Sequence, residues 1–127
     1  MIPDWAGYLE YRDAFAQVAD PRYYPMDWLD GRILDGIAQF ARSENAAIVF
    51  ELRQYPGGAI DVHGLIAAGD KDEIINELIP QAEAWGRENG ATAGVVESRP
   101  GWAKALKPHG YEVAQVTIRK ELTDGPQ

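Results

Sequence analysis

The sequence predicts one α/β domain in which helices cover both faces of a central mixed sheet. Segments with the apolar spacing of helices alternate with short runs typical of strands, in the expected order α-α-β-β-α-β-α-β. The length of 127 residues fits a single domain, expected over residues 1–122, with a flexible tail at 123–127. Hydrophobic residues make up 46% of the chain and charged residues 25%, which is the composition of a folded protein.

Two helices are expected in the first third of the chain. Over residues 5–18 apolar side chains recur at helical spacing, and Asp4 stands at the position of an N-cap. Two prolines within residues 20–25 predict a loop, because the residue before a proline avoids helical geometry. Asp27 is expected to cap a second helix, whose apolar stripe continues over residues 28–41.

A β-hairpin is expected next. Residues 46–55 and 59–66 are rich in β-branched and other apolar side chains, and the turn sequence Pro56-Gly57-Gly58 separates them. The pattern therefore predicts two neighbouring antiparallel strands.

A long helix is predicted over residues 70–89. Asp70 and Glu73 have the spacing of a capping box, and the apolar residues that follow form one stripe for burial. The sequence Asn89-Gly90 is typical of a helix end.

Three short elements complete the predicted fold. Residues 92–96 predict a strand covered on both faces, and Pro100 suits the first turn of a short helix that runs to Leu106. Gly110 suits the exit from that helix. Residues 111–122 alternate well enough to predict a last strand.

The second half of the chain, residues 60–122, carries a family resemblance. Its parts are the strand ending near Gly69, the helix over residues 70–89, and the run Glu-x-Arg-x-Gly-Trp-x-x-x-Leu that begins at Glu97 and precedes His109-Gly110-Tyr111. This order of elements resembles the GNAT N-acetyltransferase superfamily. The run itself is similar to small GNAT-like proteins carried by bacteriophages and prophages. The resemblance implies a GNAT-like fold.

The resemblance also implies an acetyl-CoA site at the start of the long helix. Members of the family bind acetyl-CoA where two adjacent parallel strands splay, with the pyrophosphate on the amides of a glycine-rich loop. The matching positions are Gly69, Asp70 and Lys71. The carboxylates of Asp70, Asp72 and Glu73 stabilise the helix start by about 0.3–1 kcal/mol each and repel a phosphate. We therefore expect a degenerate loop.

Few residues are candidates for acyl-transfer chemistry, which needs a base for the amine and an acid for the thiolate. Glu97, at the end of a strand, is the candidate catalytic base, with a salt bridge as the alternative role. Glu51 and His63 are weaker candidates, because ordinary strand positions explain both. Trp102 occupies the place where a family acid tyrosine stands, and an indole does not replace a phenol as proton donor. Tyr111 is expected to pack in the core.

Composition narrows the classes of partner. A net charge of −8 disfavours direct binding to nucleic acid. Cysteine is absent, the two histidines lack metal-ligand spacing, and no apolar run approaches the ~20 residues that span a bilayer. We therefore expect no metal, no membrane contact and a cytoplasmic location. Tyr23 and Tyr24, on a proline-flanked loop, are the candidate contacts to a protein partner or in self-association.

Three functions remain open from the sequence. The leading hypothesis is a GNAT-fold protein with a degenerate acetyl-CoA loop, a non-catalytic binding or assembly component that requires no cofactor. Such a protein of phage origin would lie in the host cytoplasm or the virion. The alternative is an acetyl-CoA-dependent N-acetyltransferase acting on a cationic small molecule or a protein amine, with Gly69 and Lys71 at the pyrophosphate and Glu97 as base. The third is an acidic module that binds a basic protein.

Overall fold

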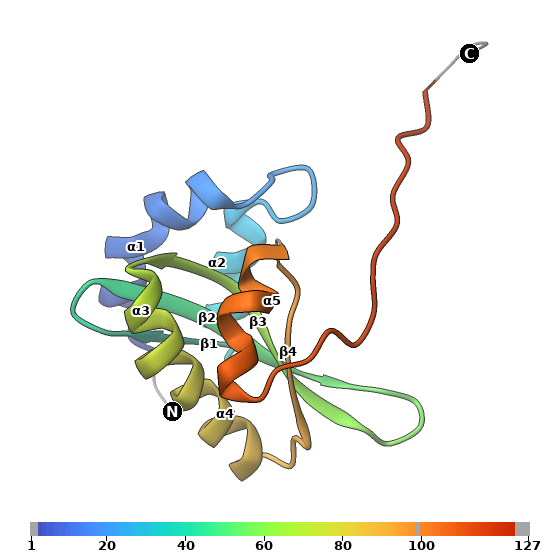
Figure 1. Cartoon of the computed structure of the whole chain (residues 1–127). Coiled ribbons are helices and arrows are strands. Elements are labelled where there is room, and N and C mark those ends of the chain that lie inside the picture. Colours follow the sequence, from blue (N-terminus) through green and yellow to red (C-terminus); the bar gives the residue numbers. More distant parts are fainter. Residues whose placement is uncertain (1–2, 99, 124–127) are drawn as a thin grey trace. The chain divides into compact units, whose positions relative to one another are not determined.

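The computed structural model describes residues 3–98 and 100–123, which divide into two compact units, Met1–Glu97 and Ser98–Gln127. The first unit contains a four-stranded sheet and the helices that cover it (Figure 1). The second unit contains one short helix and the segment that follows it.

The sheet of the first unit has the strand order β1-β2-β3-β4. Its strands are β1 (Ala38–Arg42), β2 (Ala46–Gln54), β3 (Ile60–Gly69) and β4 (Ala93–Val96). The pairs β1–β2 and β2–β3 are antiparallel, which confirms the predicted hairpin, whereas β3–β4 is parallel. The sheet is therefore mixed, as the sequence predicts.

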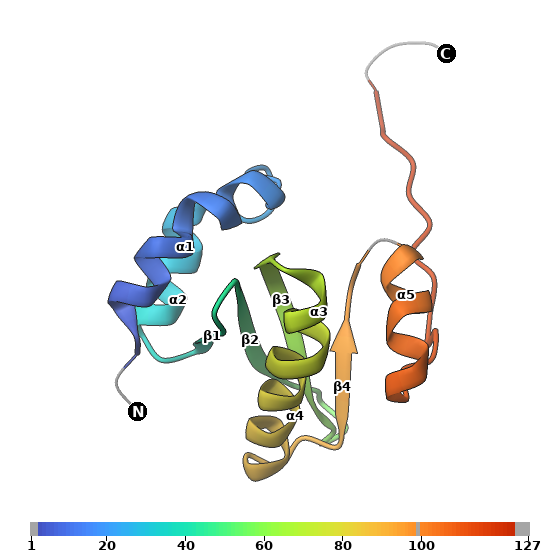
Figure 2. The same cartoon turned by 60° about the vertical axis from the view of Figure 1, so that its left-hand side comes forward.

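Helices cover both faces of this sheet (Figures 1 and 2). One face carries α1 (Trp5–Val18) and α2 (Met26–Leu34). The opposite face carries the continuous helical segment α3 (Lys71–Glu73), the π-helical turn η1 (Ile74–Leu78) and α4 (Ile79–Glu88). This segment confirms the long helix expected from the apolar stripe.

The core beneath α1 and α2 is largely aromatic. Tyr8 and Phe15 of α1 are fully buried, with ring centroids 6.0 Å apart. The hydroxyl of Tyr8 donates a hydrogen bond of 2.6 Å to Asp30 of α2, and Arg12 binds both oxygens of that carboxylate. This contact joins the two helices above the sheet.

The core on the opposite face is built from the other side chains of β2 and β3. Phe50 meets Trp85 edge to face, with ring centroids 5.3 Å apart. A Cβ at Gly86 would lie 2.8 Å from the side chain of Val62, so α4 approaches the sheet closely at that glycine. The two cores place the long helix and the α1–α2 pair firmly against β3.

The second helix is shorter than predicted, and a strand follows it. Helix α2 has Pro25 at its N-cap, so the predicted cap at Asp27 is wrong and that carboxylate lies in the first turn. After α2, Gly36 adopts a positive φ of 75° and the chain enters β1. The apolar residues at 37, 40 and 41 fit the side-chain spacing of a helix as well as that of a strand. Antiparallel pairing with β2 makes this segment a strand.

Strand β4 lies at the edge of the sheet and is only half-buried, so the expectation of a strand covered on both faces is wrong. Its four residues pair with β3 alone among the described residues. One side of β4 consequently has no strand beside it in the part of the chain that the structure describes.

The second unit contains α5 (Pro100–Leu106) and the 3₁₀ turn η2 (Lys107–His109), and Gly110 ends them with φ at 90°. This confirms the short helix and its glycine exit. The predicted last strand is wrong, because residues 111–123 form no strand and Tyr111 is not in the buried core. Alternation gives a segment the propensity for a strand, but a strand forms only where another strand satisfies its backbone groups. Most of the predicted tail, residues 124–127, lies outside the described residues.

Candidate active site

The parallel strands β3 and β4 pair only along part of their length. The pairs run from Asp61 opposite Ala93 to Gly64 opposite Val96. Beyond Gly64, β3 continues for five residues to Gly69 without a β4 partner. This stretch of β3 offers backbone N–H and C=O groups along the edge that β4 leaves, in the described part of the chain.

A β-bulge lies at the point where the two strands part. Val49 of β2 pairs with Ile66, whereas the next residue, Phe50, pairs with Gly64, so Leu65 is the extra residue on β3. A bulge bends the strand and re-aims the neighbouring side chains. Here it changes the direction of β3 immediately after His63.

Six polar side chains gather next to this bulge, on the face of the sheet that also carries α1 and α2. Glu51 pairs with His63 across β2 and β3, so their side chains leave the sheet on the same side. Alternation along each strand adds the neighbours two residues away. The polar cluster comprises Glu51, Arg53, Tyr55, Asp61, His63 and Glu97.

His63 lies at the centre of the polar cluster and is only 4% exposed. Its Nε2 is 3.1 Å from the hydroxyl of Tyr55, and its Nδ1 is 3.7 Å from Oε1 of Glu97. Burial lowers the pKa of His63 below its ordinary value, and the nearby Arg53 lowers it further, against the opposing effect of the carboxylates. The imidazole is therefore neutral near pH 7 and able to accept a proton.

Glu97, the predicted base, lies in the polar cluster at its solvent side. Its carboxylate is 3.2 Å from Nη1 of Arg53, and its side chain is 64% exposed. Its exposure and its contact with Arg53 place this carboxylate at the rim of the cluster. The geometry favours Glu97 as the group that orients His63, in the way that carboxylates orient catalytic imidazoles.

Glu51 is a buried carboxylate at the boundary between the polar cluster and the aromatic core, and it is 5% exposed. Arg32 of α2 donates a hydrogen bond to Glu51, and its guanidinium lies 4.8 Å from the ring centroid of Trp28. The Nε of Arg32 is buried with no hydrogen-bond partner among the described residues. Glu51 thus ties α2 to the sheet, which is a structural role.

Sequence reasoning missed three members of the cluster, Arg53, Tyr55 and Asp61, of which Tyr55 has a perturbed pKa. Partial desolvation raises its pKa, and the neighbouring Asp61 raises it further. The phenol therefore stays protonated at neutral pH and can supply a proton. The available signal was the spacing of Glu51, Arg53 and Tyr55, since every second residue of a strand faces the same side.

The predicted acetyl-CoA residues Gly69, Asp70 and Lys71 lie together at the end of the free edge of β3. Gly69 has φ at 104°, and a Cβ there would lie 2.3 Å from the carbonyl oxygen of Asn45. The fold of the β1–β2 hairpin thus requires this glycine independently of any ligand.

The expected capping box is only half formed. Oδ1 of Asp70 accepts a hydrogen bond of 3.0 Å from the amide of Glu73, as predicted. The carboxylate of Glu73 does not return to Asp70 but accepts bonds of 2.8 and 2.9 Å from the backbone N–H and the side-chain amide of Asn45. These bonds lower the pKa of Glu73. One of the three predicted carboxylates is therefore directed to the β1–β2 turn.

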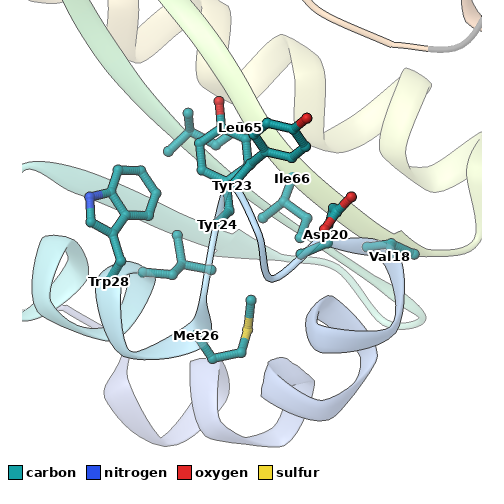
Figure 3. Close-up of a pocket in the computed structure, with 10 residues that line it drawn as sticks. Val18, Asp20, Tyr23, Tyr24, Met26, Trp28, Leu65 and Ile66 are labelled. Carbon is teal, nitrogen blue, oxygen red and sulfur yellow. The ribbon is translucent and has the colours of Figure 1, made fainter. Parts of the chain in front are cut away.

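Tyr23 and Tyr24, predicted as partner contacts, lie in the loop between α1 and α2. Both are exposed, and both line a cavity of about 320 Å³ whose opposite wall is Leu65 and Ile66 of β3 (Figure 3). The cavity and the polar cluster lie on the same face of the sheet. Ile66 pairs with Val49, and Val49 shares a face with Glu51 because the two are two residues apart on β2. The cavity and the polar cluster thus share this face of the sheet, and the link between them is β3, on which the lining residues Leu65 and Ile66 closely follow His63.

No group of three or more His, Asp or Glu side chains among residues 3–98 and 100–123 is arranged to hold a metal ion. Within the same ranges, no helix has the length and apolar character that crossing a bilayer requires.

Comparison with known proteins identifies the class of fold. An acetyltransferase from Trypanosoma brucei matches with a TM-score of 0.67 at 10% identity, over 96% of this chain and 97% of that chain. A predicted acetyltransferase from Clostridium acetobutylicum with acetyl-CoA matches with a TM-score of 0.67 at 7% identity, over 93% of this chain and 90% of that chain. An aminoglycoside N-acetyltransferase in complex with CoA matches with a TM-score of 0.67 at 17% identity, over 94% of this chain and 96% of that chain.

The chain therefore has the GNAT acetyltransferase fold, which confirms the resemblance of fold drawn from the sequence. No protein-family model and no curated protein sequence matches it. The link to phage proteins stays a prediction. At such identities the likeness concerns the fold, and the chemistry is argued from the site.

Proposed function

We propose that this protein is an acetyl-CoA-dependent N-acyltransferase that uses His63 as its general base. The observation that carries the proposal is a buried imidazole with a lowered pKa, held between Tyr55 and Glu97 at the point where β3 and β4 part. Perturbed titratable groups that converge beside a cavity are typical of active sites.

Each neighbour of His63 has a proposed role. His63 accepts the proton that the acceptor amine loses. Glu97 is a positioning residue that fixes the ring orientation through Nδ1, with Arg53 holding its carboxylate. Tyr55, whose hydroxyl lies 3.1 Å from Nε2 of His63, is the proton donor for the departing thiolate. This assignment replaces Glu97 as base and supplies an acid that Trp102 does not provide.

Acetyl-CoA supplies the activated acyl group. In the reaction the amine nitrogen forms a bond to the thioester carbonyl carbon and the carbon–sulfur bond breaks. One proton passes from the amine to His63, and one passes from Tyr55 to the sulfur, so that amide and free thiol are the products. Proton exchange with water returns both side chains to their starting state.

Two features support acetyl-CoA as the donor. The edge of β3 from Leu65 to Gly69 has no β4 partner among the described residues, so its amides and carbonyls can pair with an extended chain of amide groups. Gly69, Asp70 and Lys71 follow at the start of the helix, the proposed place of the pyrophosphate. Two structural neighbours, both of GNAT fold, contain acetyl-CoA or CoA.

A second candidate is the non-catalytic binding component predicted from the sequence. The observation that favours it is the acidic helix start, where Asp70 and Asp72 are exposed and would repel a pyrophosphate. The transferase should bind acetyl-CoA and the binding component should not, so one titration with acetyl-CoA distinguishes the two candidates.

The test combines calorimetric titration of acetyl-CoA with measurement of thiol release in the presence of a panel of primary amines. We expect saturable binding and thiol release with at least one amine. His63→Gln should lower kcat/KM by about 10²–10⁴-fold, because that is the usual contribution of a general base, while acetyl-CoA still binds. His109→Gln, in the second unit, is the matched control and should leave the rate unchanged.

Three outcomes decide the proposal. Absence of acetyl-CoA binding at millimolar concentration would sink it and favour the binding component. Full activity of His63→Gln would remove His63 from its role. A Glu97→Gln variant that is as impaired as His63→Gln and loses the pH dependence of kcat/KM, while His63→Gln keeps it, would return Glu97 to the part of base.

A further inference from the structure

The cavity beside the bulge of β3 is small and is lined in part by aromatic side chains. Its volume is about 320 Å³, at the lower end of ligand pockets, which suits a molecule with one or two rings. Figure 3 shows the side chains of the α1–α2 loop and of α2 gathered opposite those of β3. The loop contributes Tyr23 and Tyr24, the helix contributes Trp28, and β3 contributes Leu65 and Ile66.

The walls of this cavity are aromatic and aliphatic. Tyr24 and Trp28 stand with ring centroids 5.3 Å apart and planes inclined by 41°. Although the guanidinium of Arg32 lies over the ring of Trp28, both residues remain partly exposed, at 44% and 36%, so they offer ring surface to an aromatic group. Val18 and Met26 add aliphatic surface, and a thioether makes favourable contacts with aromatic rings. Such walls favour an apolar ring over a strongly hydrated chain.

The one carboxylate among the lining residues is already bound. Arg22 donates to both oxygens of Asp20, with Nη2–Oδ2 at 2.7 Å and Nε–Oδ1 at 3.1 Å. A second cationic group of a substrate would compete with that bidentate pair. The charge of the cavity therefore gives no support to a polyamine or another polycation as the ligand.

The cavity is adjacent to the proposed base along β3. Leu65 and Ile66 follow His63 by two and three residues, a separation of about 7–10 Å along a strand. Ile66 lies on the same sheet face as His63, since their partners on β2 are Val49 and Glu51. A ring held in the cavity can thus carry an amine on a short arm toward Nε2 of His63.

We propose that the acceptor of this protein is a primary amine that carries an aromatic ring, with the ring seated between Tyr24, Trp28 and Leu65. The inference deepens the proposed acyl transfer and rests on it for the reaction, but the binding of the ring stands on the cavity alone. It also narrows the cationic small molecule or protein amine expected from the sequence to an arylalkyl amine.

The experiment compares phenethylamine and tryptamine with putrescine and ethanolamine as acceptors for acetyl-CoA. We expect kcat/KM to be higher by about tenfold or more for the two aromatic amines, because burial of a few apolar groups in a pocket discriminates on that scale. Tyr24→Ala should raise KM for phenethylamine and leave KM for acetyl-CoA unchanged. Leu34→Ala, an exposed position on α2 outside the cavity, is the matched control.

A second readout does not depend on turnover. Phenethylamine is titrated into the protein alone and followed by calorimetry. Saturable binding that Tyr24→Ala weakens and Leu34→Ala preserves supports the aromatic acceptor, even if acetyl-CoA fails to bind and the transferase proposal falls. Acetyl transfer to putrescine at an equal or higher kcat/KM overturns the aromatic acceptor while the transferase proposal stands. Failure of phenethylamine to bind in either assay overturns it as well.

Discussion

The two ends of one sheet face differ sharply in chemistry. At one end β2 presents Ala47 and Val49 to the fully buried rings of Tyr8 and Phe15 on α1. At the other end the same strand continues with Glu51 and the rest of the polar cluster. Both ends face the side of the sheet that α1 and α2 cover.

The sheet face changes from apolar to polar at the point where α2 stops covering it. Arg32, near the end of α2, reaches Glu51, the first charged residue along the face. Farther along the face, past Arg32 and Glu51, no apolar side chain of α1 or α2 in the described core cluster packs on the sheet. There His63 is buried among polar neighbours. Within a few residues the strand thus changes from close apolar packing to a charged, partly buried network.

The apolar end should carry most of the stability. Phe15→Ala should lower the free energy of unfolding by about 3–5 kcal/mol, because the ring is fully buried and the cavity collapses only partly. Urea unfolding measures the effect. Leu9→Ala, 49% exposed on the same helix, is the control and should stay within about 0.5 kcal/mol of the parent. Equal losses at both positions would contradict the packing described for α1.

The glycine at the end of β3 should matter through its contact with the β1–β2 turn. Gly69→Ala should cost about 2–4 kcal/mol, since it adds a clash with Asn45 to the strain of a positive φ. Gly58→Ala has a similar φ of 94° and open space around it, so it should cost only about 1–2 kcal/mol. If the two variants unfold alike, the close approach to Asn45 is not the cause.

The boundary pair should behave as a buried ion pair. Arg32→Met should lower the free energy of unfolding by about 1–3 kcal/mol, because it leaves the carboxylate of Glu51 buried without its cation. Adding Glu51→Met to Arg32→Met should recover part of the loss. By contrast, Arg22→Met removes a solvent-exposed pair with Asp20 and should leave unfolding unchanged. A double variant that is less stable than Arg32→Met would refute this account.

The smallest expected effect is a pH dependence of stability from the polar end. Burial lowers the pKa of His63, so the unfolded chain binds a proton at a higher pH than the folded chain. The free energy of unfolding therefore falls as pH decreases below about 6.5 and levels off below the folded pKa. The lowered pKa of Asp30 acts in a more acidic range, where stability is lost as that carboxylate is protonated.

Urea unfolding between pH 5 and 8 measures this dependence. His63→Gln should have a flatter profile between pH 7 and 5.5, whereas His109→Gln, at a position where the structure places no buried contact, should follow the parent. Parallel profiles for the parent and His63→Gln would show that the imidazole is not held neutral by burial.

Local patterns in the sequence predicted much of the fold. Asp4 accepts a hydrogen bond from the amide of Gly7, and Asp70 caps the long helix, both as expected. The hairpin, the long helix and the short helix after Pro100 were predicted from side-chain period and turn residues alone. The sequence predicts a helix through residues 38–41, but residues 38–42 form strand β1, because their apolar side chains fit the spacing of either element.

The candidate site was predicted only in fragments. The sequence predicts Glu97, Glu51 and His63 as separate candidates, and the structure brings their side chains into one polar cluster. Their grouping with Tyr55 depends on the register of β2 against β3. That register contains a bulge at Leu65, and no local pattern in the chain announces it.

By itself, the sequence determined the α/β class, the caps of two helices and the residues available for chemistry, because period, turn chemistry and capping act between residues close in the chain. Only the tertiary structure decided that residues 38–42 form a strand and residues 111–123 do not. It also decided that His63 is buried between Tyr55 and Glu97. Strand pairing and burial depend on residues far apart in the sequence, and their free energies exceed local propensities.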